Sequence, residues 1–256
     1  MTSPAGDGGV LVVVPTYNEY DNLIDLVERI RTTVPTADIL IVDDASPDGT
    51  GKLADTLAAD DDHLHVLHRL AKQGIGVAYV AGYGWGMARS YERFVQMDAD
   101  GSHLPEQIPH LLDRLADADL VIGSRWVYGG GIVNWSRRRE WLSRGGNLYA
   151  RWMLDLPVRD ATGGFRAFRR RTLDGLALGA VASQGYCFQV DLARRAVGAG
   201  FRVTEVPIRF VERRFGDSKM SGGIVVEALW RVTLWGLRHR LRQMRDVRWR
   251  YRRSTR

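Results

Sequence analysis

The sequence is poor in cysteine and in lysine. It has 256 residues but a single cysteine, Cys187, so no intramolecular disulfide can form. This excludes the small, disulfide-stapled secreted folds and favours a reducing compartment, in which Cys187 is expected to be a small packed side chain. Lysine occurs only at Lys52, Lys72 and Lys219, so arginine supplies nearly all of the positive charge.

The sequence also lacks a long apolar run. Its longest candidate, residues 224–237, is interrupted by Glu227 and Arg231. A membrane-spanning helix needs roughly 20 mostly apolar residues, so none is expected. Residues 1–9 are small and polar, unlike a secretory signal, and we expect them to be disordered. These features predict a cytoplasmic protein, so that any association with the cytoplasmic face of a membrane would be peripheral.

Positive charge is concentrated at the C-terminal end. The net charge is +6, and residues 238–256 contain nine arginines and one aspartate, so the rest of the chain is slightly negative. Such a tail attracts anionic lipid by about 1 kcal/mol per arginine near the surface; a disordered solubilising tail and a nucleic-acid-binding tail are the alternatives. Because its aromatic residues are only Trp249 and Tyr251, and no nucleic-acid-binding module is present, no nucleic-acid partner is expected.

Short apolar runs alternate with segments of helical periodicity through the first half of the chain. This alternation is typical of an α/β fold, so we expect a mostly parallel, doubly wound sheet flanked by helices. The expected strands are residues 10–14, 39–42, 64–67, 94–97 and 120–123. The expected helices are residues 22–33, 51–59, 76–88 and 106–115.

After residue 123 the alternation stops. The length suits one α/β domain, which we place at residues 10–237. Its second half is expected to hold a segment rich in Gly, Trp and Arg over 125–144, helices over 146–154 and near 189–199, a strand over 203–211 and a C-terminal amphipathic helix before the basic tail.

Acidic residues follow two of the expected strands at the point where each ends. Asp43 and Asp44 follow the second strand, Asp98 and Asp100 follow the fourth, and Pro-Thr-Tyr-Asn-Glu at 15–19 closes the first. Taken alone, the first acidic pair also fits a phospho-receiver acid pocket, the second a solvated turn, and residues 15–19 a helix cap. Together they lie at the carboxyl edge of one sheet, where open α/β sheets bind ligands. Two carboxylates so close need a counter-ion, and a divalent cation beside a diphosphate supplies one, which indicates a nucleotide-sugar site.

These motifs resemble the GT-A family 2 glycosyltransferases, and most closely their polyprenyl (dolichyl) phosphate mannosyltransferases. The similarity continues through Gly-Ser-Arg at 123–125, Asp-Ala-Thr-Gly-Gly-Phe-Arg at 160–166 and the Phe-Val-Glu-Arg to Gly-Asp-Ser-Lys segment at 210–219. The resemblance implies a GT-A (Rossmann-like) domain, with residues 125–155 forming an acceptor and membrane-interface segment.

The resemblance further implies an activity and a set of site residues. The activity is transfer of mannose from GDP-mannose to a polyprenyl monophosphate, with inversion to a β-linked product and with Mg²⁺ or Mn²⁺. Asp98 and Asp100 would ligate the metal and, with Arg125, carry catalysis, while Asp43 supports its turn. Donor contacts would come from Pro15, Tyr17, Glu19, Val42, Asp44 and Ala99, and phosphate or acceptor contacts from Lys72, Arg125, Arg139, Arg144, Arg213 and Lys219.

The sequence leaves the roles of three residues undecided. Ser102 and His103 follow the second acidic pair, and Lys72 follows the third expected strand. Some relatives carry a glutamine ligand where this chain has Ser102, whose shorter side chain leaves direct ligation or a bridging water as alternatives. His103 is either a metal ligand or a turn histidine without a role. Lys72 either reaches a phosphate or is an ordinary surface lysine. The nearby Gly74 and Gly76 do not indicate a dinucleotide site, because no third glycine has the required spacing.

Tryptophan and arginine interleave over residues 126–152. The segment is predicted to lie at a membrane interface, with aromatic rings at headgroup depth and arginines toward anionic lipid; ordinary core packing is the alternative.

For the function of the whole chain, the alternatives are a glycosyltransferase with a UDP-sugar (glucose or N-acetylglucosamine) donor, a nucleic-acid-binding protein and an inactive partner subunit. The expected partners are GDP-mannose, a polyprenyl phosphate lipid and the cytoplasmic membrane surface, and a separate membrane-anchoring subunit is a further candidate.

Overall fold

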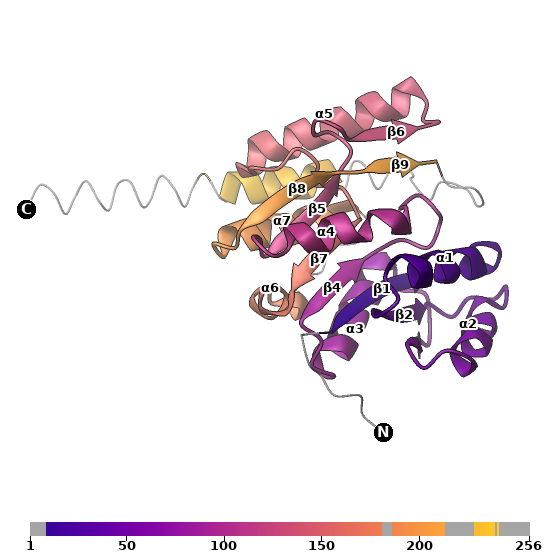
Figure 1. The fold of residues 1–256 in the computed structure, drawn as a ribbon. Coiled ribbons are helices and arrows are strands. Elements are labelled where there is room, and N and C mark those ends of the chain that lie inside the picture. Colours follow the sequence, from indigo (N-terminus) through magenta and orange to yellow (C-terminus); the bar gives the residue numbers. More distant parts are fainter. Residues whose placement is uncertain (1–8, 181–185, 213–227, 239, 241–256) are drawn as a thin grey trace, which may run out of the picture.

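The chain folds around a seven-stranded sheet with the strand order β3-β2-β1-β4-β7-β5-β8. The computed structural model describes residues 9–180, 186–212, 228–238 and 240. All neighbouring strands are parallel except β7, which is antiparallel to both β4 and β5. The strands are β1 (Val10–Thr16), β2 (Asp38–Asp43), β3 (Leu64–His68), β4 (Arg93–Gln96), β5 (Leu120–Ser124), β7 (Arg166–Arg169) and β8 (Val203–Pro207). A separate parallel pair joins β6 (Gly131–Val133) to β9 (Arg209–Val211), next to helix α5 in Figure 1.

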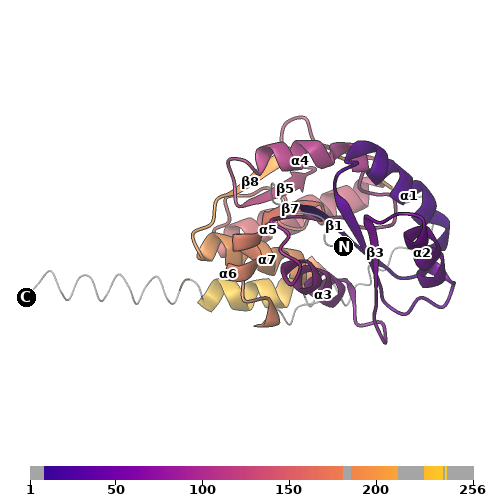
Figure 2. The same cartoon turned by 60° about the horizontal axis from the view of Figure 1, so that its bottom comes forward.

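Helices cover both faces of the sheet. Figure 2 shows α1 and α4 on one side and α3 and α7 on the other. The helices are α1 (Tyr20–Thr33), α2 (Thr50–Ala59), α3 (Ile75–Met87), α4 (Ile108–Arg114), α5 (Arg137–Leu154), α6 (Arg170–Gly175), α7 (Tyr186–Gly198), a helix over 228–238 and two short 3-10 turns at Pro105–Gln107 and Leu178–Ala180. In the described ranges, no helix combines the length and the apolar character needed to cross a bilayer.

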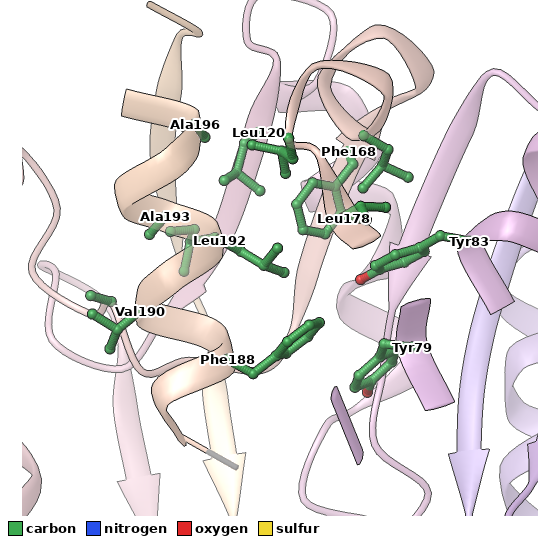
Figure 3. Close-up of a cluster of buried hydrophobic side chains, with 14 of the residues drawn as sticks. Tyr79, Tyr83, Leu120, Phe168, Leu178, Phe188, Val190, Leu192, Ala193 and Ala196 are labelled. Carbon is green, nitrogen blue, oxygen red and sulfur yellow. The ribbon is translucent and has the colours of Figure 1, made fainter. Parts of the chain in front are cut away.

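Successive side chains of β1 point into two hydrophobic cores. Val10, Val12 and Val14 pack in the core beneath α1 and α4, and Leu11 and Val13 belong to the core beneath α3 and α7. Figure 3 shows the second core, in which aromatic side chains of α3 and α7 meet. Because both faces of the sheet are buried around β1, β2 and β5, these strands contain continuous apolar runs, which is why the sequence pattern located them.

Helix α3 forms despite four glycines because glycine lets it lie close to the sheet. A Cβ at Gly82 would overlap the Val13 side chain, and one at Gly86 would lie 2.5 Å from Leu11 Cδ2. Gly84 faces open space, with nothing within 4 Å of its Cβ position. A Cβ at Gly76 would likewise lie 2.8 Å from Phe188 Cδ2, so three of the four glycines are required by packing.

Gly82→Ala is expected to destabilise the fold by about 1–3 kcal/mol, because the added methyl group overpacks the contact with Val13. The measurement is the free energy of unfolding in urea. Gly84→Ala on the same helix is the control and should be neutral or stabilising by up to about 1 kcal/mol. Equal effects of the two substitutions would show that helix propensity, rather than close packing, governs α3.

The second half of the chain departs from the sequence-based expectation in three places. Helix α5 begins at Arg137 rather than at residue 146, because Ser136 caps it by accepting a hydrogen bond from Arg139 N at 3.4 Å. The expected strand over 203–211 is broken at Ile208, so that β8 joins the main sheet and β9 pairs with β6. Strand β7 was not predicted at all, since an arginine stands at each end of its four residues.

Other expectations concern the ends and the lone cysteine. Cys187 is buried, as predicted for a small packed side chain. The predicted disordered N-terminus falls almost entirely outside the described residues. So do Arg213 and Lys219 and most of the arginine-rich tail.

Candidate functional site

The loops after β1 and β2 are tied together at the carboxyl edge of the sheet. The main-chain N–H of Asn18 donates to Ser46 Oγ at 3.1 Å, and that of Glu19 donates to Thr50 Oγ1 at 3.0 Å. Asp43 accepts hydrogen bonds from both the hydroxyl and the main-chain N–H of Ser46, at 2.5 and 3.1 Å. Asp43 therefore braces the turn, and the two predicted donor-binding loops form one surface.

The predicted donor-binding residues in and just after β1 and β2 differ in how deeply their side chains are buried. Pro15 and Val42 are register partners in neighbouring strands and are buried. Tyr17 is half-buried, and Lys72 Nζ lies 3.7 Å from the centroid of its ring, a cation–π contact. Glu19 accepts a hydrogen bond from the Asn22 side chain at 2.8 Å, within its own helix start. Tyr17 and Lys72 are thus brought together, although they are far apart in the sequence.

Asp44 is buried and already engaged. Its side chain forms an ion pair with Arg69, and it accepts a hydrogen bond from Gln73 N at 3.2 Å. Arg69 also donates to Gln73 Oε1 at 2.8 Å. The loop between β3 and α3 therefore closes over the carboxylate that was predicted to contact the base and ribose. Sequence reasoning missed Arg69, although a buried strand-end carboxylate without a counter-charge was a signal for it.

The second acidic turn follows β4 and carries Asp98, Ala99 and Asp100. The Asp98 side chain is 28% exposed, while Ala99 is buried. Asp100 Oδ1 accepts hydrogen bonds from the Ser102 main-chain N–H at 3.1 Å and from its hydroxyl at 2.6 Å. Ser102 thus supports Asp100 in this structure. His103 is buried against Phe165, with ring centroids 5.0 Å apart, and burial lowers the pKa of its imidazole.

This turn fits a hard divalent cation. Its two carboxylates offer the oxygen donors that Mg²⁺ and Mn²⁺ prefer. Among the described residues, no group of three or more His, Cys, Asp or Glu side chains forms a metal site. The protein would therefore supply two carboxylates, which is how Mg²⁺ is commonly held when phosphate oxygens and water complete the coordination.

Arg125, at the end of β5, is clamped by Asp160. Its Nε and Nη2 atoms donate to the two Asp160 oxygens at 2.7 and 2.6 Å, and the two side chains are 5% and 0% exposed. Burial alone would raise the pKa of Asp160, but the charge and hydrogen bonds of Arg125 hold that pKa below its usual value. Thr162 and Asn147 extend the network, with Asn147 Nδ2 and Arg125 Nη2 both donating to Thr162 Oγ1 at 2.9 Å. The predicted phosphate contact is thus held in one orientation, by partners to which the sequence reasoning assigned no role.

Aromatic rings surround this arginine. The centroids of Trp126, Trp135 and Phe210 lie 5.3–5.5 Å from the Arg125 guanidinium carbon. Arg139 stacks over Trp135 at 4.0 Å and contacts Glu212 Oε1 at 3.3 Å. The predicted acceptor residues Arg125 and Arg139 therefore lie on the same aromatic cluster.

An apolar cavity of about 440 Å³ opens beside the cluster. It lies between α5, α7 and the helix over 228–238, and both Arg125 and Arg139 line it. Trp141 and Leu229, also in the lining, are 76% and 43% exposed, so the cavity reaches the surface at these two helices. Arginine at one end and apolar side chains elsewhere suit an amphiphilic anion.

The mostly parallel sheet with acidic turns at its carboxyl edge places the chain in the class of GT-A-like glycosyltransferases. Solved structures of glucosyl-3-phosphoglycerate synthase from Mycobacterium tuberculosis share the fold. The complex with phosphoglyceric acid has a TM-score of 0.66 at 19% identity, covering 89% of this chain and 80% of that one. The complex with Mn²⁺, UDP-glucose and phosphoglyceric acid has a TM-score of 0.65 at 20% identity, with the same coverage.

The chain belongs to glycosyl transferase family 2, whose family model matches residues 11–176. It is 55% identical over 236 residues to undecaprenyl-phosphate mannosyltransferase of Micrococcus luteus, covering 92% of this chain and 97% of that protein. It is 53% identical over 239 residues to polyprenol monophosphomannose synthase of Mycolicibacterium smegmatis, covering 93% and 90%. The predicted family and fold are confirmed.

Proposed function

We propose that this enzyme transfers mannose from GDP-mannose to a polyprenyl monophosphate, with inversion and with Mg²⁺ or Mn²⁺. The names of the two close relatives support the sugar and the acceptor. The observation that carries the proposal is the apolar cavity with Arg125 and Arg139 in its lining. A free sugar or a small soluble phosphate does not need an apolar cavity. A phosphate attached to a hydrocarbon chain would place its phosphate at the two arginines and its chain among the apolar side chains.

The acceptor phosphate would sit at the arginine end of the cavity. Arg125, held by Asp160, and Arg139, stacked on Trp135, present planar guanidinium groups that suit phosphate oxygens. The indole N–H of Trp135 is buried and finds no hydrogen-bond acceptor among the described residues. An anion in the cavity is the kind of partner such a donor lacks.

The chemistry demands little proton transfer from the protein. A phosphate monoester carries between one and two negative charges near neutral pH, so an acceptor oxygen attacks the anomeric carbon without a side-chain base. The new C–O bond forms as the bond to the GDP diphosphate breaks, and the leaving oxygen keeps the electron pair. A single displacement of this kind inverts the anomeric centre. The protein's own contribution is to align the acceptor phosphate with the donor diphosphate and to neutralise their charge with arginine.

Asp98 and Asp100 would hold the divalent cation against the donor diphosphate. Bound there, the cation offsets the charge that develops on the departing GDP. Ser102 keeps Asp100 oriented for this role through two hydrogen bonds to Oδ1. The Mn²⁺ bound with UDP-glucose in the structurally similar synthase supports a metal of this type.

A UDP-sugar donor is the second candidate, because the solved structures of the same fold include UDP-glucose complexes. Thermal shifts with Mn²⁺ and either GDP-mannose or UDP-glucose separate the two. We expect the larger rise in melting temperature with GDP-mannose. The functional test is a vesicle-reconstituted assay with radiolabelled nucleotide sugars. Label entering lipid from UDP-glucose but not from GDP-mannose would overturn the proposed donor.

The exposed faces of α5 and the last described helix support docking on an anionic membrane surface. Large apolar side chains there stand in solvent: Trp141 is 76%, Leu148 67%, Trp152 64% and Trp230 64% exposed. Arg240 stacks over Trp152 at 4.6 Å. Since Trp141 also lines the cavity, a lipid acceptor would enter it directly from the membrane.

Replacing Trp141 and Trp152 together by serine is expected to weaken binding to phosphatidylglycerol vesicles at least about tenfold, because two interfacial aromatic anchors are lost. Co-sedimentation with vesicles measures the change. Tyr128→Ser is the control, since Tyr128 is fully exposed but lies outside these helices. Unchanged vesicle binding by the double variant would remove the docking surface from the proposal.

A further inference from the structure

We infer that Tyr79 and His103 are positioning residues that hold Asp98 in its metal-binding orientation. The sequence analysis assigned no role to Tyr79 and left His103 as either a metal ligand or a turn histidine without a role. The inference rests on the proposed part of Asp98 in binding the diphosphate-bound cation. It concerns how that carboxylate is oriented before any ligand arrives.

Tyr79 fixes the side chain of Asp98. Its hydroxyl donates to Asp98 Oδ1 at 2.6 Å, and the tyrosine is fully buried on α3. A tyrosine hydroxyl is a hydrogen-bond donor near neutral pH, so this contact is an O–H to carboxylate bond. The ring stacks on Phe188 of α7, with centroids 6.2 Å apart and planes 5° from parallel (Figure 3). The hydroxyl is therefore held by the packed core rather than by a mobile surface group.

His103 fixes the main chain of Asp98. Its Nδ1 atom accepts a hydrogen bond from the Asp98 main-chain N–H at 3.0 Å. Since Nδ1 is the acceptor, the proton of the neutral ring is on Nε2. The ring is 1% exposed, stacked on Phe165 and in edge contact with Phe210, whose centroid lies 5.4 Å away. The histidine thus links the acidic turn to β9 and to the aromatic cluster around Arg125.

The other carboxylate oxygen, Oδ2, lies 3.9 Å from His103 Nδ1, and no side chain among the described residues donates a hydrogen bond to it. Gly164 lies beside this oxygen, and a Cβ at Gly164 would come within 3.2 Å of it. The absence of that side chain keeps the approach open. A carboxylate held at its main chain and at one oxygen presents the other at a defined place, which is the usual role of groups that orient metal ligands.

Tyr79→Phe tests the inference against a matched control, Tyr83→Phe. Tyr83 lies one turn further along α3, is equally buried and donates to Gln96 Oε1 at the same 2.6 Å, but it does not touch Asp98. Mn²⁺ is titrated in the presence of GDP, with the thermal shift as readout. We expect Tyr79→Phe to raise the half-saturating Mn²⁺ concentration about 10- to 100-fold, as loss of such supporting partners does. Tyr83→Phe should leave it unchanged.

His103 is tested with a pair of substitutions. His103→Asn keeps a hydrogen-bond acceptor near the place of Nδ1, and His103→Leu removes it. The leucine variant should need more Mn²⁺ for half-saturation, and the asparagine variant should recover most of the difference. In the transfer assay, both Tyr79→Phe and His103→Leu should raise the metal requirement more than they lower the rate at saturating Mn²⁺.

Asp98→Ala separates the inference from the proposed function. If Asp98→Ala abolishes the Mn²⁺-dependent shift while Tyr79→Phe and Tyr83→Phe behave alike, the positioning roles are wrong and the metal assignment stands. If Asp98→Ala keeps the original Mn²⁺ midpoint, the metal assignment fails and the inference fails with it. Should His103→Leu not fold, as judged by circular dichroism, the tyrosine pair decides the outcome.

Discussion

Asp100→Ala is expected to lower the rate of mannosyl transfer to polyprenyl phosphate about 100- to 1,000-fold, the usual loss when one preorganised charge-stabilising group is removed. Asp100 is one of two carboxylates on the turn after β4, and Ser102 orients it through two hydrogen bonds. Without it, a cation at the donor diphosphate would lose one of its two proposed carboxylate ligands. Radiolabelled GDP-mannose and membrane vesicles containing the acceptor measure the transfer.

An exposed aspartate provides the control for this loss. Asp117→Ala alters a carboxylate that is 75% exposed and lies 3.9 Å from Arg114, away from the acidic turns. It should leave transfer unchanged. Undiminished lipid-linked mannose from Asp100→Ala would contradict the metal assignment, whereas equal losses from both variants would point to a general effect of charge.

Asp160→Ala is expected to destabilise the protein by about 3–5 kcal/mol, because it removes the carboxylate that is paired with the buried Arg125 guanidinium. Arg125 is 5% exposed, and Asp160 receives two of its side-chain hydrogen bonds and one from its main chain. The free energy of unfolding in urea measures the loss. Transfer should fall as well, because Arg125 is no longer held toward the acceptor phosphate.

A double variant separates stability from activity. Replacing both partners, as Arg125→Met with Asp160→Leu, removes the buried charges together and should recover part of the lost stability. Transfer should stay low, since the proposed contact of Arg125 with the acceptor phosphate is removed. A double variant with recovered stability and normal transfer would show that Arg125 has no part in catalysis.

Much of the sheet was predictable from the sequence because of how it is buried. The strands β1, β2, β4 and β5 are covered on both faces, so each contains an apolar run that ends at a turn, whereas the edge strand β3 is only partly buried. The acidic turns follow directly from these strand ends, because parallel strands bring their carboxyl ends to one edge. The local sequence pattern and the common direction of the parallel strands were sufficient to predict this half of the fold.

The antiparallel strand β7 was not predictable in the same way. Arg166 begins the strand and is fully buried, donating to the carbonyl groups of Ala161, Gly163 and Gln189. Burial lowers the pKa of its guanidinium to about 10. An arginine in a short run argues against a buried strand until its carbonyl partners, brought from a loop and another helix, are known.

The sequence by itself determined the class of fold, the edge of the sheet that carries the site and the acidic residues that would hold a cation. These follow from periodicity and from residue types at strand ends, which are local properties of the chain. Only the tertiary structure decided that Asp160 clamps Arg125, that Arg69 covers Asp44 and that Tyr79 reaches Asp98. These pairs are 35, 25 and 19 residues apart in the sequence. Their meeting depends on how helices and loops pack over the sheet, which no local pattern encodes.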